Sequence, residues 1–112
     1  MKKLFLITIF AIIPVVSHQQ PLSVEQEVAM DIGQQIECMA KNIYYEAGVE
    51  SDIGKYAVGT ITVNRLRTGR WGNTVCKVVY APAQFSWTLR KKLPLPDSLL
   101  YARCEQIARL VL

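Results

Sequence analysis

The sequence contains a single histidine, His18. Zinc sites of hydrolases use histidine ligands, and a serine or cysteine nucleophile needs a histidine as its base. His18 lies beside the predicted end of an N-terminal leader, where the chain is not expected to belong to a folded cleft. No glycine-rich phosphate loop follows a strand either. These absences argue against most metal-dependent, nucleophilic and nucleotide chemistry, and we expect no metal and no other cofactor.

Cysteine is also scarce, since the chain has only Cys38, Cys76 and Cys104. No two of them have the Cys-x-x-Cys spacing of a metal or redox site, which favours a structural role. One disulfide can form and one thiol then remains. We predict the pair Cys38 and Cys76, which would tie the helix carrying Glu46 to the segment before Tyr80.

No apolar run is long enough to cross a membrane. The longest, residues 4–16, follows Lys2 and Lys3, whereas a helix across a bilayer needs about 20 apolar residues. A short apolar run after two lysines is typical of a secretory signal, and an uncleaved anchor is the alternative. We therefore predict a signal peptide over 1–17, with transient membrane contact, and one domain over 18–112 that is exported to the periplasm or cell envelope.

Negative charge is scarce in the second half of the chain. Residues 53–112 contain ten Lys and Arg but only Asp97 and Glu105 as acids, whereas residues 18–52 contain seven acids and one base, Lys41. Such asymmetry can reflect packing of the two segments on each other, or a cleft beside a basic rim that attracts an anionic polymer. An exported protein rarely meets nucleic acid. We expect no nucleic acid partner and favour an anionic cell wall or membrane surface.

Helical periodicity and helix-end signals predict a helical domain. The predicted helices run from Val24 to Glu46, from Ile53 to Thr68, from Val75 to Tyr80, and from Asp97 toward the end of the printed sequence. Gly33 is a point where the first helix could divide into two. The segment from Val58 to Val63 is rich in β-branched residues and reads as a strand in isolation. The helical spacing of this segment and its flanking caps favour a helix. The later segment from Gln84 to Trp87 is predicted to be a loop.

One carboxylate, Glu46, stands between tyrosines and small apolar residues in Ile43-Tyr44-Tyr45-Glu46-Ala47-Gly48. Such neighbours would remove water from the acid and favour its protonated form. Glu46 also shares a helix face with Met39, Asn42 and Ile43, so we predict that it points inward or into a cleft. With histidine chemistry excluded, glycosidic bond cleavage by a carboxylic acid is the favoured reaction of an exported protein. A second acid could come from Glu50 or Asp52, or none is needed if a sugar hydroxyl attacks.

Several short segments resemble the SleB-type cell wall hydrolases, which include the spore cortex-lytic enzymes. The segments are Cys38 to Ala47, Ala57-Val58, Asn64-Arg65, Thr74 to Cys76, Val78 to Tyr80 and Gln84 to Trp87. The resemblance covers about residues 36–88. It implies a mainly α, compact, lysozyme-like domain that cuts the glycan strands of peptidoglycan, in the best understood cases as a lytic transglycosylase. Glu46 matches the catalytic glutamate, and Glu50 matches the second acid of an E-A-R-G-E pattern in which Gly48 and Val49 replace Arg and Gly.

The same resemblance and the local chemistry suggest which residues bind the substrate. The candidates are Tyr45, Asn64, Arg65, Tyr80, Gln84, Phe85 and Trp87. Phe85 and Trp87 could instead fill the core, and Asn64 and Arg65 could be a solvated helix end. We expect a monomer whose partner is the glycan strand.

Members of the family continue into a Gly/Thr-rich segment with a Tyr-His pair, which this sequence does not contain. The interpretations are therefore a truncated product, a minimal enzyme, or a protein that keeps the fold without activity. In the last case it would bind peptidoglycan or another envelope component without cleaving it.

Overall fold

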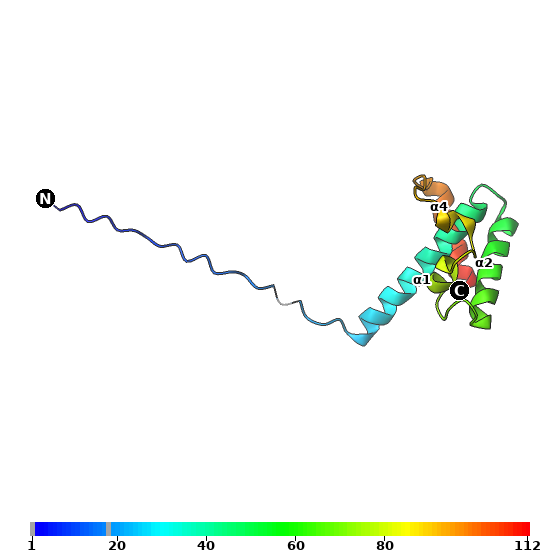
Figure 1. The fold of residues 1–112 in the computed structure, drawn as a ribbon, viewed down its shortest axis with the longest axis horizontal. Helices are drawn as coiled ribbons and strands as arrows, with labels where there is room; N and C mark the ends of the chain where they lie inside the picture. Colours follow the sequence, from blue (N-terminus) through cyan, green and yellow to red (C-terminus); the bar gives the residue numbers. More distant parts are fainter. Residues whose placement is uncertain (1, 18) are drawn as a thin grey trace.

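The computed structural model describes residues 2–17 and 19–112, and its regular elements are helices (Figure 1). They are α1 (Val24–Ala47), α2 (Asp52–Thr68), α3 (Val75–Tyr80), the 3-10 helix η1 (Ser86–Leu89) and α4 (Ser98–Val111). The described residues contain no strand, so the predicted mainly α fold class is confirmed. His18, which we excluded from the catalytic machinery, lies outside the described residues.

Side-chain caps fix the starts of three of these helices. The Ser23 hydroxyl accepts the Gln26 N–H (3.3 Å), and the Gln26 side chain accepts the Ser23 N–H (3.0 Å), which completes a capping box on α1. The Thr74 hydroxyl accepts the N–H of Lys77 (3.2 Å), and Asp97 accepts two N–H groups in the first turn of α4. The predicted helix starts are confirmed to within about one residue, the usual uncertainty of a helix end.

The β-branched segment is helical, as the caps predicted. It forms the middle of α2, which begins after Ser51 and ends at Gly69. Gly69 has φ 69°, the left-handed conformation that glycine adopts without a steric penalty. Gly59 is buried where α2 approaches α4, and a Cβ atom there would lie 3.0 Å from Val111. Packing against another helix thus overrides the local preference for a strand.

The structure decides one alternative that the sequence left open and corrects one local prediction. Helix α1 continues through Gly33 without a break, because the helical turns on both sides supply its backbone hydrogen bonds. The predicted loop over Gln84 to Trp87 is helical from Ser86 onward, since Thr88 N–H bonds to the Phe85 carbonyl (3.2 Å) and begins a 3-10 turn.

Replacing Gly33 with alanine is expected to raise the free energy of unfolding by about 0.5–1 kcal/mol, because alanine loses less backbone entropy in a helix. A Cβ atom at this position would have no neighbour within 4 Å, so the substitution causes no clash. Urea denaturation followed by circular dichroism measures the change. The matched control is Gly72→Ala, which should destabilise, because Gly72 has φ 142° and a Cβ there would lie 2.5 Å from Lys77. A Gly33→Ala protein less stable than wild type would contradict the expectation.

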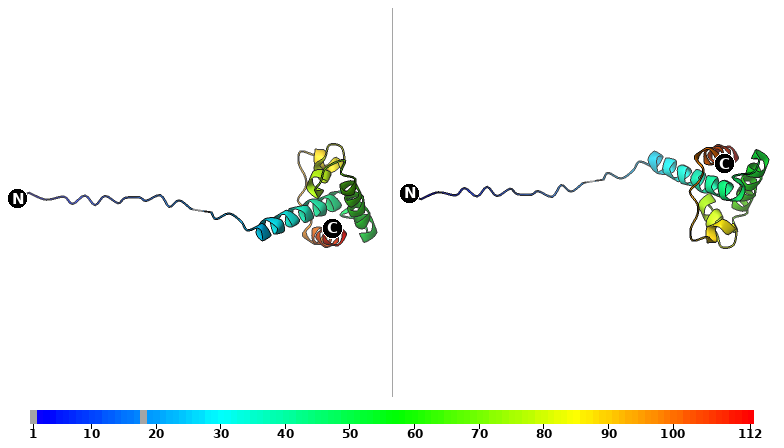
Figure 2. Two further views of the ribbon diagram at one scale, coloured as in Figure 1. Left: turned by 90° about the horizontal axis from the view of Figure 1, so that it is seen from below. Right: turned by 90° about the horizontal axis from the view of Figure 1, so that it is seen from above.

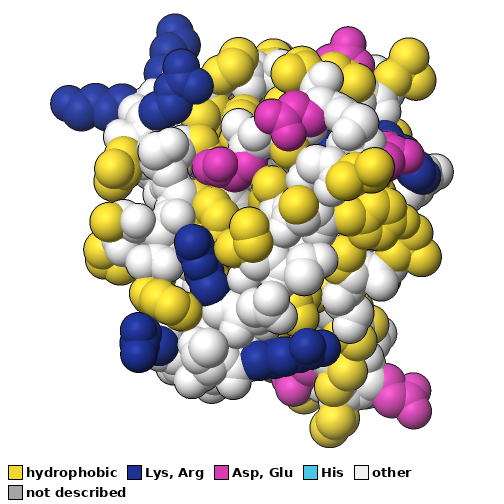
Figure 3. Space-filling view, turned by 90° about the vertical axis from the view of Figure 1, so that its right-hand side faces the viewer, with side chains coloured by type: hydrophobic (Ala, Val, Ile, Leu, Met, Phe, Trp, Pro, Cys, Tyr) yellow, Lys and Arg dark blue, Asp and Glu magenta, His cyan; other side chains and the backbone are white. Residues whose placement is uncertain are grey.

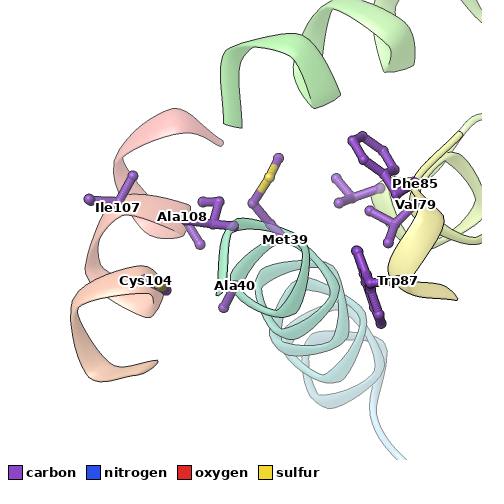
Figure 4. Packing of buried hydrophobic residues seen from close by; sticks show 10 residues of the cluster. Met39, Ala40, Val79, Phe85, Trp87, Cys104, Ile107 and Ala108 are labelled. Carbon is purple, nitrogen blue, oxygen red and sulfur yellow. The ribbon is translucent and has the colours of Figure 1, made fainter. Parts of the chain in front are cut away.

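The core forms around the second half of α1 (Figure 4). On one side α4 contributes buried residues such as Cys104 and Ile107, and on the other α3 and η1 contribute Val79 and Trp87. Met39 of α1 lies between these groups and is fully buried. Helix α1 is therefore the element against which the other helices pack.

The chain as a whole is less compact than predicted, because its N-terminal part projects from the helical core (Figures 1 and 2). The Cα radius of gyration is 24.0 Å, against about 13 Å for a compact domain of 100 residues. The residues before α1 are extended, and α1 is exposed from Val24 to Gln34. In the described residues, no helix has both the length and the apolar character that crossing a membrane requires.

The predicted disulfide between Cys38 and Cys76 is confirmed, and it joins α1 to α3. The Cα atoms of the two residues are 5.2 Å apart. Near the bond, the Cys76 N–H donates to the Gln35 side chain (3.0 Å). The third thiol, Cys104, is fully buried in the core, and burial raises its pKa. This thiol is therefore poorly placed to exchange with the disulfide.

Candidate functional site

The last turns of α1 carry Tyr44, Tyr45 and Glu46. Tyr45 stacks on Trp87 (ring centroids 4.9 Å apart), and its hydroxyl donates to the Pro94 carbonyl (3.1 Å). The Tyr44 hydroxyl accepts the Asp97 N–H (2.9 Å), and its ring lies edge-on to that of Tyr45. These contacts hold both tyrosines against the segment that follows η1.

The predicted burial of Glu46 is wrong, because its side chain is exposed. Consecutive residues on a helix point in different directions, so the tyrosines just before Glu46 cannot cover it. Asn42, one turn earlier on the same face, is fully buried. Glu46 thus lies at the end of α1 where this buried face reaches solvent.

Glu50 lies at the start of α2 and is exposed. A Cβ atom on Gly54 would lie 2.6 Å from Oε2 of Glu50, so the carboxylate occupies the space that a side chain would fill. Its position suits a negative charge, because the N-terminus of a helix carries a partial positive charge. The buried Lys55, 4% exposed, donates its Nζ hydrogen to the Glu50 carbonyl oxygen. Glu50 is therefore fixed relative to α2.

An ion pair also fixes the start of α2 to α4. Arg103 donates from Nη2 and Nε to the two carboxylate oxygens of Asp52, at 2.6 and 3.2 Å. Hydrogen bonding to this guanidinium keeps the pKa of Asp52 below its ordinary value. Asp52, one of the two acids weighed as a partner of Glu46, is therefore engaged in a contact between helices.

A buried hydrogen-bond network lies beneath the last turn of α1. Asn42 accepts the indole N–H of Trp87 (2.8 Å) and donates to the Thr62 hydroxyl (3.0 Å). The Thr62 hydroxyl in turn donates to the Val58 carbonyl (2.8 Å). The network ties α1, α2 and η1 together. Sequence reasoning missed the role of Asn42, although a polar residue at a core position of a helix was the available signal.

Replacing Asn42 with leucine is expected to lower the free energy of unfolding by about 1–3 kcal/mol, because the buried indole N–H of Trp87 would lose its acceptor. Urea denaturation followed by circular dichroism measures the loss. The matched control is Asn64→Leu in α2, an exposed position where a change within about 0.5 kcal/mol is expected. If the urea midpoint of Asn42→Leu equals that of the wild type, the network does not stabilise the fold.

The predicted substrate-binding residues fall into two groups. Tyr45, Trp87 and Tyr80 form a row of aromatic rings, with Tyr80 edge-on to Trp87 at 5.7 Å between centroids. Tyr80 is 50% exposed, whereas Trp87 is 4% exposed and lies in the core. Any direct contact of this row with a ligand in this conformation must come from the two tyrosines.

The second group surrounds Arg65. Its guanidinium donates to the Gln84 carbonyl (3.1 Å) and lies over the Phe85 ring at 4.7 Å. Phe85 is 7% exposed and belongs to the core, and the neighbouring Asn64 is exposed. Arg65 therefore holds the segment that leads into η1. No hydrogen bond or ion pair joins either group to Glu46 in the described residues.

Two cavities lie elsewhere on the described chain. The larger, about 600 Å³, is lined mainly by Ile32, Ile36, Leu66 and Val75, and the smaller, about 290 Å³, includes Glu37. Neither contains a predicted site residue. Among the described residues, no cluster of His, Cys, Asp and Glu could hold a metal ion. Figure 3 shows a group of Lys and Arg side chains projecting at one corner of the face that it draws.

A protein-family model described as Cell Wall Hydrolase matches residues 49–112. The matched part begins after Glu46 and runs from Val49 through α2, α3, η1 and α4. It includes Glu50 and every predicted substrate-binding residue except Tyr45. No curated protein and no solved structure matches the chain.

Proposed function

The chain belongs to the cell wall hydrolase family, and on that premise we propose that it cleaves the glycan strands of peptidoglycan with Glu46 as the proton donor. The family match over more than half of the chain carries the proposal. Glu46 has two further supports. It lies on the turn of α1 that also presents Tyr45, and the single histidine of the sequence, the residue type most often used for proton transfer, is His18, directly after the predicted leader.

One glutamate can complete the reaction if the sugar supplies the nucleophile. Glu46 gives its proton to the glycosidic oxygen as the bond from that oxygen to C1 breaks. The 6-hydroxyl of the same muramoyl residue then bonds to C1 and returns a proton to Glu46. No water is consumed, and the new end is an anhydromuramoyl group. The reaction is therefore that of a lytic transglycosylase.

The exposure of Glu46 affects how this acid can work. A general acid works best where water is excluded, and solvent reaches the side chain of Glu46 in this conformation. A glycan strand lying across the last turn of α1 would displace water from Glu46. We propose that the bound substrate excludes water from Glu46 in this way.

Substrate contact is assigned to the members of the two groups that reach solvent, which are the exposed Tyr80 and Asn64 and the half-buried Tyr45 and Gln84. Tyr45 and Tyr80 offer aromatic faces to sugar rings, with Trp87 as the support between them. Asn64 and the side chain of Gln84 offer hydrogen-bonding groups, and Phe85 and Arg65 position the segment that carries Gln84. Glu50 assists, either through its charge or by orienting a water molecule if the reaction is hydrolytic.

Peptidoglycan lies outside the inner membrane, so the proposal requires export. The leader over residues 1–17 is assigned this task, with the periplasm or cell envelope as the destination. In the described part of the leader, the apolar side chains are exposed and add nothing to the core. Removing the leader would therefore remove no packing contact from the described core.

Product analysis of digested sacculi tests the proposal. The full chain is incubated with purified sacculi, and released muropeptides are identified by mass spectrometry. Anhydromuramoyl ends, one water lighter than reducing ends, are the expected result. Reducing ends would instead indicate attack by water and give Glu50 the second carboxylate role.

A binding protein without activity is the second candidate, and the exposure of Glu46 outside either cavity favours it. It predicts that the chain sediments with sacculi but releases nothing. Failure both to sediment and to release muropeptides would contradict both functions.

A further inference from the structure

Three consecutive cations, Arg90, Lys91 and Lys92, are exposed directly after η1. The ion pairs of the described residues involve Lys41 and Arg103, so none of these three cations has a carboxylate partner there. Adjacent like charges repel one another, and no contact within the described chain offsets that repulsion. The fold therefore leaves these charges free for an anionic ligand.

The segment that carries the cations is fixed at both ends. The Arg90 N–H donates to the Trp87 carbonyl (3.1 Å), which holds the start of the segment to η1. Leu93 packs against the core, and the Pro94 carbonyl accepts the Tyr45 hydroxyl (3.1 Å). Proline restricts the backbone further. The backbone that carries the cations is thus held in place before a ligand arrives, which lowers the entropy cost of binding.

The hydrogen bond to Tyr45 places this segment beside the proposed site, because Tyr45 is one of the proposed substrate contacts. A glycan strand that contacts Tyr45 would therefore lie near the segment that carries the cations. The sugar backbone of the strand is uncharged, whereas its stem peptides carry carboxylates. Cations beside an aromatic row therefore complement both parts of such a substrate.

We propose that Lys91 and Lys92, together with Arg90, bind the carboxylates of stem peptides attached to the glycan strand. The proposal rests on the proposed function, since it assigns the substrate class of that site. It makes strands whose stem peptides carry free carboxylates the preferred substrate over strands whose stem peptides are amidated. Because the cations are exposed, their contribution should weaken as salt screens it.

The test compares the full chain with the double variant Lys91→Gln/Lys92→Gln. Sacculi freed of attached phosphate polymers are the ligand, and sedimentation measures binding at low and high salt. The variant is expected to bind roughly 5- to 20-fold more weakly at low salt, the range for two exposed ion pairs, and the difference should shrink at high salt. If the chain cleaves sacculi, KM should rise while kcat stays the same.

The matched control is Arg67→Gln/Arg109→Gln, which removes the same charge from two exposed positions on other helices. It should bind like wild type. Sacculi whose stem-peptide carboxylates have been converted to methylamides should bind wild type and the lysine variant equally. Equal weakening by both double variants, or the same loss on the amidated sacculi, would overturn the proposal. Because sedimentation does not depend on turnover, a chain that binds sacculi without cleaving them would contradict the proposed enzyme and still decide this point.

Discussion

Replacing Glu46 with glutamine is expected to slow glycan cleavage about 10²- to 10⁴-fold, the usual contribution of a general acid and base. Glutamine has nearly the same shape but cannot give or take the proton that the leaving oxygen and the sugar hydroxyl exchange. Release of muropeptides from sacculi over time measures the effect. The fold should be unaffected, because Glu46 is exposed and no salt bridge within the described residues includes it.

The matched control is Glu27→Gln, an exposed carboxylate near the opposite end of α1. It should cleave at the wild-type rate. Glu50→Gln separates the two chemical routes: a loss as large as that of Glu46→Gln would indicate a second essential carboxylate, whereas a small loss supports a single acid. Cleavage at the wild-type rate by Glu46→Gln would remove this residue from the mechanism.

Much of the helical arrangement could be predicted, because local signals determine it. Ser23, Thr74 and Asp97 cap helices as the sequence predicts, and Gly69 ends α2 in the left-handed conformation that favours glycine. The disulfide was predicted by choosing one of the three pairs that three cysteines allow. In each case the residues that decide the outcome are close in sequence, or too few to allow many choices.

The environment of Glu46 could not be predicted from its neighbours in the sequence. Tyr44 and Tyr45 bond to Asp97 and Pro94, about fifty residues later, and these distant contacts decide where the rings point. Tyr44 and Tyr45, which suggested a buried acid, instead bind the segment after η1. The burial of Lys55 could not be predicted for another reason. A lysine is rarely buried, and the group that it binds, the Glu50 carbonyl, is a backbone group that side-chain patterns do not reveal.

Removing the disulfide is expected to be the most destabilising of the changes considered. In the chain-entropy model, a bond between residues 38 positions apart stabilises the fold by about 4 kcal/mol, because it limits the unfolded chain. The free energy of unfolding of a small domain is about 5–15 kcal/mol, so the loss is a large share of it. The double variant Cys38→Ser/Cys76→Ser should unfold at much lower urea concentration than the oxidised wild type.

Reductant provides the control for this experiment. It should lower the stability of the wild type to about that of the double variant and leave the double variant unchanged, because the remaining thiol, Cys104, is already free and buried. The segment closed by the disulfide contains Glu46 and α2, so loss of the bond removes a constraint on the positions of both. Cleavage should therefore fail at a lower temperature in the reduced protein. Equal urea midpoints for oxidised and reduced wild type would mean that packing between α1 and α3 holds the fold without the covalent bond.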